Sequence, residues 1–290
     1  MGAADVVPGV SGGTIAFITG IYTRLISSLT SFDLELLGLV LRFKLAAAWK
    51  HVDANFLLAL FAGILCSILS LAHIISYLLE HLPVLLWSFF LGLIFASAIW
   101  MLRGVSYIKL VDAIPLVAGV ALIYLIAISP ATPLSPSLPI VFVGGFIAIS
   151  AMLLPGVSGS FLLLLMGLYA TTIEAVKNLD VVYLLTFAFG AGCGFLVFSR
   201  VIKWLLNRFY RQTLLFLIGL LVGSLYVVWP WKQVDGDFSQ NLLPSTYADQ
   251  IGDPMLVWSL LSAVLGMAII FSFELFSGKK KRSSSPTEAQ

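Results

Sequence analysis

The stretch Met152-Leu-Leu-Pro-Gly-Val-Ser-Gly-Ser-Phe-Leu162 interrupts an apolar run that extends over residues 138–176. This run is too long for one membrane-spanning helix, because roughly 20 apolar residues cross a bilayer. Each arm around the interruption has about 15 residues, or roughly 22 Å as a helix, which is shorter than a hydrocarbon core of about 30 Å. Pro and Gly between two short arms predict a re-entrant hairpin of half-helices.

The composition of the whole chain is that of a membrane protein. Of its 290 residues, 60% are hydrophobic and only 10% are charged, and the mean hydropathy is +1.05. A soluble domain carries about 25% charged residues, so lipid is the solvent of most of this surface. Outside the interrupted run, the segments long and apolar enough to span a bilayer are residues 55–79, 84–102, 110–129, 181–199, 212–229 and 255–276. We therefore predict an all-α polytopic membrane protein.

A second copy of the interrupting motif lies near the N-terminus. Asp5-Val-Val-Pro-Gly-Val-Ser-Gly-Gly-Thr-Ile15 matches the first stretch at an offset of 147 residues (152 − 5). At the same offset, Gly20 matches Gly167 and Tyr22 matches Tyr169. Farther along, the offset is 127 residues, and the matched positions are Cys66 with Cys193, Gly92 with Gly219, and Ser97 with Ser224. These matches indicate an internal duplication.

The duplication divides a single integral membrane domain into two halves. We expect residues 1–137 to form the first repeat, with one motif, an interfacial helix at 33–50 and three spans. Residues 138–278 form the second repeat, with one motif and three spans, and residues 279–290 form a basic tail. The segment 33–50 mixes leucines with Asp, Glu, Arg and Lys, which is typical of a helix lying on the membrane surface.

The Lys and Arg residues between the spans predict the orientation, because cytoplasmic loops carry an excess of basic residues. We place the C-terminal tail in the cytoplasm and fold residues 138–176 as a re-entrant hairpin. Every basic cluster then falls on the cytoplasmic side. Three spans and one hairpin per half make an odd number of crossings, so the two halves insert in opposite directions. We therefore predict inverted repeats, as in many secondary transporters.

The two motifs carry groups that bind an anion. In this arrangement their tips enter the membrane from opposite sides and meet near the midplane. Broken backbone at that depth leaves N–H groups to be satisfied, and the N-termini of half-helices favour anions. The candidate substrate-binding residues are Pro8, Gly9, Ser11, Gly12, Gly13, Thr14, Pro155, Gly156, Ser158, Gly159 and Ser160. They suit a phosphate or carboxylate head group, and the competing interpretation is a packing kink between helices.

Three charged residues complete the set of candidates. Asp5 is the acidic residue next to the first tip, and Met152 replaces it in the second copy. An intramembrane carboxylate is a functional candidate, and Asp5 either binds a coupling proton or caps the adjacent half-helix. Arg24 and Arg200 are candidate counter-charges for an anionic head group. Their alternative role is to reach the cytoplasmic interface and fix the topology.

Other classes of function fit the sequence poorly. A net charge of +2 gives no electrostatic footprint for nucleic-acid binding. A membrane-embedded phosphatase or transferase needs a nucleophile or a metal cluster, and the three histidines, His51, His73 and His81, have no clustered spacing. Cys66 and Cys193 lie in apolar runs without a Cys-X-X-Cys pattern. We therefore expect no catalytic residue, no metal site and no cofactor.

The first motif, followed by Gly20-Ile-Tyr22, resembles the signature of the polyprenyl-phosphate transporter family. The second motif, followed by Gly167-Leu-Tyr169, resembles the second signature of that family. The resemblance covers nearly the whole chain. It implies a bacterial plasma-membrane flippase that returns undecaprenyl phosphate from the outer to the cytoplasmic leaflet. A proton and a sodium ion are the candidate coupling ions, and the sequence does not choose between them.

Two expectations accompany this resemblance. Members of the family have a hydrophobic stretch before the first signature, whereas only residues 1–4 precede Asp5 here, so the first hairpin is expected to lack its first arm. The alternative function that the residues alone leave open is a secondary transporter of a small soluble anion, which would use the same pair of tips.

Overall fold

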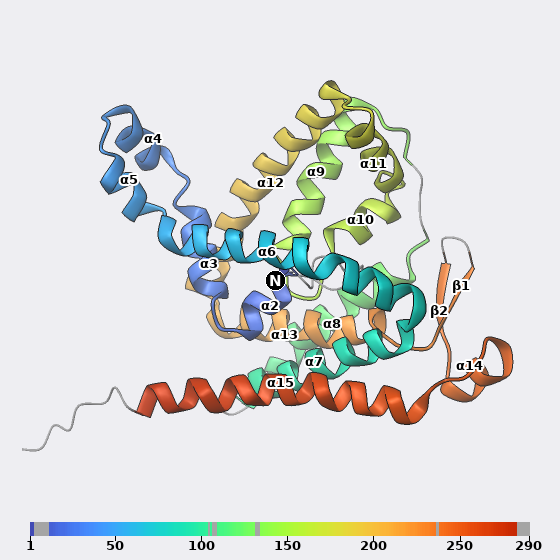
Figure 1. The fold of residues 1–290 in the computed structure, drawn as a ribbon. Helices are drawn as coiled ribbons and strands as arrows, with labels where there is room; N and C mark the ends of the chain where they lie inside the picture. The colour runs from blue at the N-terminus through green and yellow to red at the C-terminus, as the bar shows by residue number, and fades with distance from the viewer. Residues whose placement is uncertain (3–11, 104, 106–108, 131–133, 236–237, 283–290) are drawn as a thin grey trace, which may run out of the picture.

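The computed structural model describes residues 1–2, 12–103, 105, 109–130, 134–235 and 238–282 (Figure 1). Within these residues, five helices are long and apolar enough to cross a membrane. They are α6 (Ala54–His81), α7 (Pro83–Arg103), α8 (Ala113–Ile128, preceded by the 3₁₀ turn η1, Leu110–Asp112), α12 (Val181–Arg208) and α13 (Tyr210–Val227). These helices confirm five of the six expected spans.

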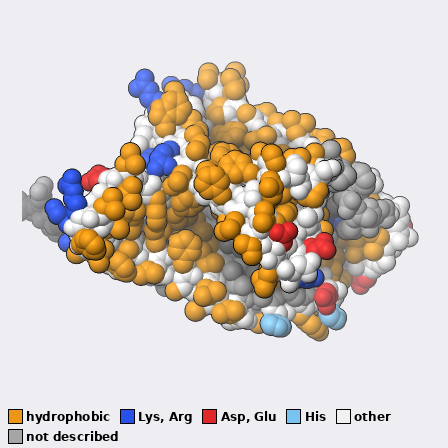
Figure 2. Space-filling view, turned by 90° about the horizontal axis from the view of Figure 1, so that it is seen from above, with side chains coloured by type: hydrophobic (Ala, Val, Ile, Leu, Met, Phe, Trp, Pro, Cys, Tyr) orange, Lys and Arg blue, Asp and Glu red, His pale blue; other side chains and the backbone are white. Residues whose placement is uncertain are grey.

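The sixth expected span corresponds to α15 (Leu256–Arg282), whose apolar portion in the described residues is Leu256–Ser272. This portion is shorter than the other candidate spans, but the helix itself continues through Lys279 to Arg282, where we expected the tail to begin. Hydrophobic side chains cover much of the face in Figure 2, and most of the visible Lys and Arg side chains gather at one end of it. The surface is that of a multi-pass membrane protein.

The interrupted run forms α9 (Leu138–Met152), α10 (Gly159–Leu165) and α11 (Tyr169–Lys177). The first arm has the expected 15 residues, and α10 packs back against α9. Our prediction of one continuous second arm is wrong, because α10 and α11 meet at an angle of 107°. Gly167, at φ 70°, ends α10, and the amides of Gly167 and Leu168 close a Schellman motif on the carbonyls of Leu164 and Leu163.

The first half repeats this break at the matching position. Helices α2 (Gly12–Ile18) and α3 (Tyr22–Thr30) are separated by Gly20, which has φ 74°. An offset of 147 residues places α2 on α10 and α3 on α11 with the same bounds, and an offset of 127 places α6 on α12. The duplication found in the sequence therefore extends to where the helices begin and end.

The segment 33–50 is not one interfacial helix, as we predicted, but a pair of short helices, α4 (Leu34–Leu41) and α5 (Leu45–His51). Phe43 separates them with φ 55°, and its neighbour Lys44 donates its amide to the carbonyl of Leu39. This is again a helix end of the Schellman type. A phenylalanine rarely adopts positive φ, so the sequence carried no signal for the break.

Helices α7 and α15 lie in close contact, although they belong to different halves (Figure 1). A Cβ atom built on Gly92 would lie 2.0 Å from the carbonyl oxygen of Ala263, and one on Gly266 would lie 2.2 Å from that of Phe89. Only glycine fits where helix backbones approach this closely. The second span of the first half is thus locked to the third span of the second half.

Helices α8 and α13 form the corresponding pair. A Cβ atom on Gly219 would lie 2.1 Å from the carbonyl oxygen of Leu116, and one on Gly119 would lie 2.3 Å from that of Phe216. These four residues are the α7–α15 contacts shifted by 127 or 147 residues (92 + 127, 263 − 147, 266 − 147 and 89 + 127). Each half therefore contributes one helix to each of two equivalent pairs.

A third close pair joins α9 to α12 (Figure 1). Cβ atoms on Gly190 and Gly194 would lie 2.0 and 2.4 Å from carbonyl oxygens of α9, whereas Gly192 has nothing within 4 Å. Gly190 and Gly194 therefore lie at the close contact between the two helices, and Gly192 does not. Gly63, which matches Gly190, has no atom of the described residues within 4 Å.

The acidic segment between α13 and α15 contains two strands and one helix. Strand β1 (Lys232–Asp235) pairs antiparallel with β2 (Phe238–Asn241), and α14 (Pro244–Gln250) follows. The Trp229 indole donates to the carbonyl of Leu242, 2.8 Å away. The fold is mostly helical, but the prediction of an all-α chain missed this small β-hairpin.

Candidate functional site

The two motif copies meet in the interior through a hydrogen bond between the halves. The backbone N–H of Gly156, in the second motif copy, donates to the hydroxyl of Thr14, which lies near the end of the first motif copy on α2, over 2.8 Å. Thr14 is only 1% exposed. A buried N–H at a chain break needs a partner, and here a side chain of the other half supplies it.

Tyr22 makes a second bond from the first half to the second motif. Its hydroxyl donates to the carbonyl oxygen of Leu153 over 2.8 Å, within the buried core. Leu153 caps the C-terminus of α9, where the last carbonyls have no partner within the helix. The first half thus satisfies both a donor and an acceptor that the interruption frees.

The backbone of the second tip is fixed by sterics and by serine hydroxyls. Gly156 has φ +83°, and a Cβ atom there would lie 2.8 Å from the carbonyl oxygen of Leu220 on α13, so both conformation and space require glycine. Ser158 precedes α10 and accepts from the N–H of Phe161 at 3.4 Å. Its hydroxyl also lies 2.9 Å from that of Ser160. Pro155 lies in the turn after α9.

A small cavity of about 10 Å³ adjoins this tip. Such a volume holds about one water molecule, so this cavity is too small for a phosphate group in this conformation. The cavity is lined by Ile123, Ile126, Gly156, Val157, Ser158, Phe161 and Val227.

The first tip is described only from Gly12 onward. Gly12 and Gly13 begin α2 and are buried. The predicted site residues Asp5, Pro8, Gly9 and Ser11 lie outside the described residues.

Arg24 lies in an exposed ion pair on α3. Its guanidinium donates to both carboxylate oxygens of Asp53, at 2.6 and 3.0 Å, and lies 4.4 Å from the centre of the Phe56 ring. The hydrogen bond from Arg24 lowers the pKa of the Asp53 carboxyl below its usual value. In this conformation the guanidinium therefore joins α3 to the start of α6.

Arg200, like Arg24, is not bonded to the described part of either tip, and its partners are backbone carbonyls. Its guanidinium donates to the carbonyls of Leu196, at 2.7 Å, and Phe32, at 2.8 Å. One turn farther along α12, Lys203 donates to the hydroxyl of Thr30 at 2.9 Å. Basic groups favour the C-terminal ends of helices, so these two residues dock α12 onto the end of α3.

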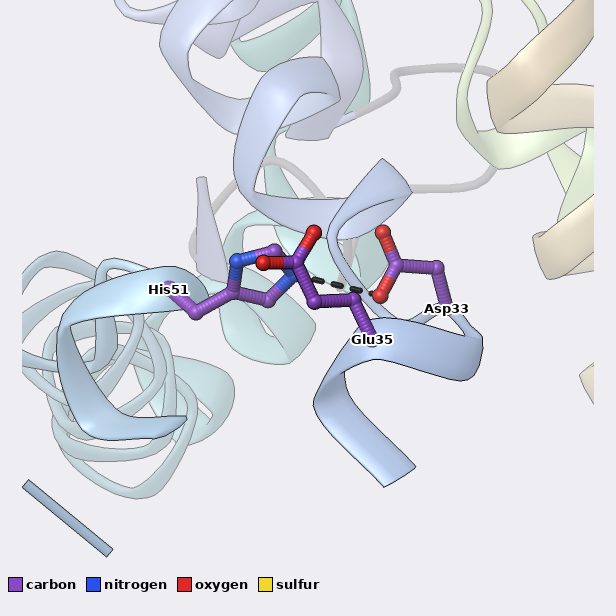
Figure 3. A group of neighbouring side chains, drawn as sticks. All are labelled: Asp33, Glu35 and His51. Atoms are coloured by element: carbon purple, nitrogen blue, oxygen red, sulfur yellow. Dashed lines mark hydrogen bonds and ion pairs between the residues drawn. The ribbon is translucent and has the colours of Figure 1, made fainter. Parts of the chain in front are cut away.

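Three chemistry-bearing side chains that we did not group from the sequence lie together on the α4–α5 pair (Figure 3): Asp33, Glu35 and His51. The carboxylate of Asp33 accepts from the N–H of Leu36 at 2.9 Å and lies 3.1 Å from Nε2 of His51. The hydrogen bond from the Leu36 N–H lowers the pKa of the Asp33 carboxyl more than the contact with His51 does. Helix capping and closure of the pair account for these contacts.

Reasoning from the sequence also did not assign a role to Tyr22. A signal was present, because Tyr22 and Tyr169 match in the duplication. The structure separates the two, since Tyr22 is 3% exposed and Tyr169 is 41% exposed. Within the described residues, the hydroxyl of Tyr22 bonds to the other half and no such bond is seen for Tyr169.

Comparison with known proteins gives concordant results. Residues 1–242 match the model of a family described as VCA0040-like, undecaprenyl phosphate translocase-like. The chain is 41% identical to a polyprenyl-phosphate transporter of Vibrio cholerae serotype O1, over 96% of this chain and 94% of the relative. It is 34% identical to a polyprenyl-phosphate transporter of Staphylococcus aureus, over 79% and 83% of the two chains. No solved structure matches the chain. The chain therefore belongs to the undecaprenyl phosphate translocase-like family, a family of multi-pass membrane transporters and not of enzymes.

Proposed function

We propose that this protein is a flippase that returns undecaprenyl phosphate from the outer to the cytoplasmic leaflet of a bacterial plasma membrane. Its two relatives are named as transporters of polyprenyl phosphate. The observation that supports a specific mechanism is the hydrogen bond from Gly156 to Thr14, because it brings the two motif copies into contact.

The phosphate binds between the two tips, and the polyprenyl chain stays in lipid. Because the cavity beside the second tip is about 10 Å³, the tips must separate before a head group enters. A phosphate oxygen then takes the place of the Thr14 hydroxyl at the N–H of Gly156. Ser158 and Ser160 donate from the second tip, and Ser11 and the backbone of Gly12 and Gly13 do so from the first. The contact between the halves thus closes the empty site.

The two halves, residues 1–137 and 138–278, insert as inverted repeats with the C-terminus in the cytoplasm. The equivalent pairs α7–α15 and α8–α13 support the duplication, and the placement of basic residues supports the orientation. Alternating exposure of the two tips moves the head group between leaflets. A proton or a sodium ion drives the cycle, and Asp5 is the carboxylate we assign to it.

Surface labelling of the lipid tests this proposal. Depletion of the protein should raise the amount of undecaprenyl phosphate on the outer leaflet, and the wild-type chain should restore it. The double variant Ser11→Ala with Ser158→Ala should be present in the membrane at normal abundance and fail to restore it. An unchanged leaflet distribution after depletion would contradict the function, and full rescue by the double variant would remove the tips from the mechanism. Flux of a small soluble anion without lipid movement would favour the other candidate.

A further inference from the structure

An apolar cavity of about 610 Å³ lies between α7 and the C-terminal end of α13. Its volume is within the range of ligand-binding sites. One wall comes from α7, the second from the end of α13, and the third from the segment that follows β1. The lining residues are Leu91, Phe95, Leu225, Tyr226, Trp229, Asn241, Leu242 and Leu243.

Two hydrogen bonds hold the segment after β1, which forms the third wall of this cavity, against the end of α13. The side-chain amide of Asn241 donates to the carbonyl of Tyr226 at 2.7 Å, and the Trp229 indole donates to the carbonyl of Leu242. The strand hairpin is thereby tied to the end of α13. The cavity is a built feature of the fold, and lipid contact alone does not explain these bonds.

A cation contacts residues that neighbour the lining of this cavity. The ammonium group of Lys232, in β1, lies 4.1 Å from the centre of the Trp87 ring and donates to the carbonyl of Val227. Trp87 lies four residues before Leu91 on α7, so the two share one face of the helix. The ammonium group therefore contacts a side chain that lies about one helical turn from a residue of the cavity wall.

The same ammonium group is bonded to a residue next to the second tip. Val227, whose carbonyl accepts from Lys232, contributes to the lining of the small cavity that contains Gly156 and Ser158. The large apolar cavity is lined by Tyr226 and Trp229, one residue before and two residues after Val227. Lys232 thus contacts a residue that lies next to both cavities.

The surroundings of Lys232 favour an anionic partner. Among the described side chains, the ion pairs involve other residues, and none brings a carboxylate to Lys232. Burial lowers the pKa of this lysine to about 8. Lys232 is partly buried, and taking an ammonium group out of water is costly unless it is paired. Its cation–π contact offsets only part of that cost, and an anion arriving from the cavity would supply a counter-charge.

We propose that the cavity and Lys232 form a loading site for a lipid with one isoprenoid chain and a terminal phosphate. The chain occupies the apolar cavity and the phosphate contacts Lys232, from which it passes to the tip at Ser158. This inference rests on the proposed function, and it adds an initial binding site for the substrate outside the two motifs. The phosphate monoester is a dianion near neutral pH, so it matches the cation better than a neutral head group does.

Binding measurements on the full chain in lipid nanodiscs test this assignment. The probes are a polyprenyl monophosphate and the corresponding uncharged polyprenol. Lys232→Gln should weaken binding of the phosphate by about tenfold or more and leave the polyprenol unaffected. Lys232→Arg, which keeps the charge, should bind the phosphate nearly as wild type. Leu91→Trp, which fills the cavity, should weaken binding of both probes.

Two matched variants serve as controls. Lys177→Gln removes an exposed lysine, and Leu185→Trp enlarges an exposed side chain of α12, so both should bind like wild type. If wild type binds the phosphate but Lys232→Gln and Leu91→Trp bind it equally well, the loading site is wrong and the proposed function stands. If wild type shows no preference for the phosphate over the polyprenol, the proposed function itself fails.

Discussion

Thr14 is the residue on which contact between the two motifs depends. Thr14→Val keeps the shape of the side chain but removes the acceptor for the N–H of Gly156. Because a buried, unsatisfied N–H costs about 1–3 kcal/mol, we expect a lower thermal unfolding temperature in detergent and slower lipid transport. Thr14→Ser should retain most of both properties.

Thr19→Val is the matched control for this change. Thr19, in the turn after α2, also bonds through its hydroxyl, but to the nearby carbonyl of Ile15 in the same half. It should unfold and transport like wild type. Equal unfolding temperatures for Thr14→Val and Thr19→Val would show that the bond between the halves contributes nothing to stability.

At the residue scale, the sequence predicted the candidate site residues better than it predicted the partners that these residues contact. Thr14 and Gly156 were both candidates, because hydroxyl groups and glycines at a chain break suit an anion. Their mutual bond joins residues 142 positions apart, and a pairing at that distance depends on how the helices pack. Arg24 and Arg200 show the same limit, since their partners are Asp53 and the backbone at Phe32.

At the scale of single helices, α12 offers two glycines with opposite surroundings. Gly190→Ala would place a Cβ atom 2.0 Å from the backbone of α9, whereas Gly192→Ala meets nothing within 4 Å. We expect Gly190→Ala to destabilise the protein by about 1–3 kcal/mol, because α9 must move away. Gly192→Ala should be neutral or stabilise by up to about 1 kcal/mol, since alanine favours a helix.

Thermal unfolding of the two purified variants decides this prediction. The pair differs by only two positions on one helix, so both variants share the same lipid and detergent environment. A stable Gly190→Ala protein would mean that α9 and α12 are not in close contact.

The start of α4 depends on the ionisation of Asp33. Its carboxylate accepts from the N–H of Leu36, and that bond lowers its pKa. A lowered carboxyl pKa means that the contribution to stability is complete above the ordinary value and is lost as pH falls through the lowered value. Hydrogen exchange of the Leu36 amide, corrected for its intrinsic rate, should show protection near neutral pH and loss of protection in acid.

Substitutions at the same helix start give an independent check. Asp33→Ala should speed exchange at Leu36 several-fold at neutral pH, and Glu35→Ala should not. Protection that persists in acid or in Asp33→Ala would contradict the capping role.

The helices themselves were largely predictable, because a run of about 20 apolar residues in the sequence is enough to indicate a membrane-spanning helix. The breaks were predictable only in part. Gly20 and Gly167 are ordinary signals for a helix end, although we read the second arm as continuous. Phe43 carries no such signal, because phenylalanine rarely adopts the positive φ that it has here.

At the scale of the whole molecule, the two halves are interlocked. Helix α7 packs on α15 and α8 packs on α13, so neither half can bury its own helix faces alone. Two separate polypeptides, residues 1–137 and 138–290, should therefore accumulate poorly when expressed singly. Expressed together they should protect each other and purify as a complex, which affinity capture of one tagged half would reveal. Stable accumulation of either half alone would indicate independent domains.

The interlocking was beyond prediction, because helical lengths and the repeat offset do not say which helices become neighbours. The offset does relate the two pairs once one is known, since Gly92 and Gly219 occupy equivalent contacts.

The pairing of α7 with α15 has a consequence for how the protein is made. Residues leave the ribosome in order, so α7 enters the membrane long before its partner, which begins at Leu256. Until then the face around Gly92 is open to lipid and to other nascent helices. This pair therefore forms only after α15 has been synthesised, and a premature stop before α15 leaves a chain that quality-control proteases can distinguish from the finished transporter.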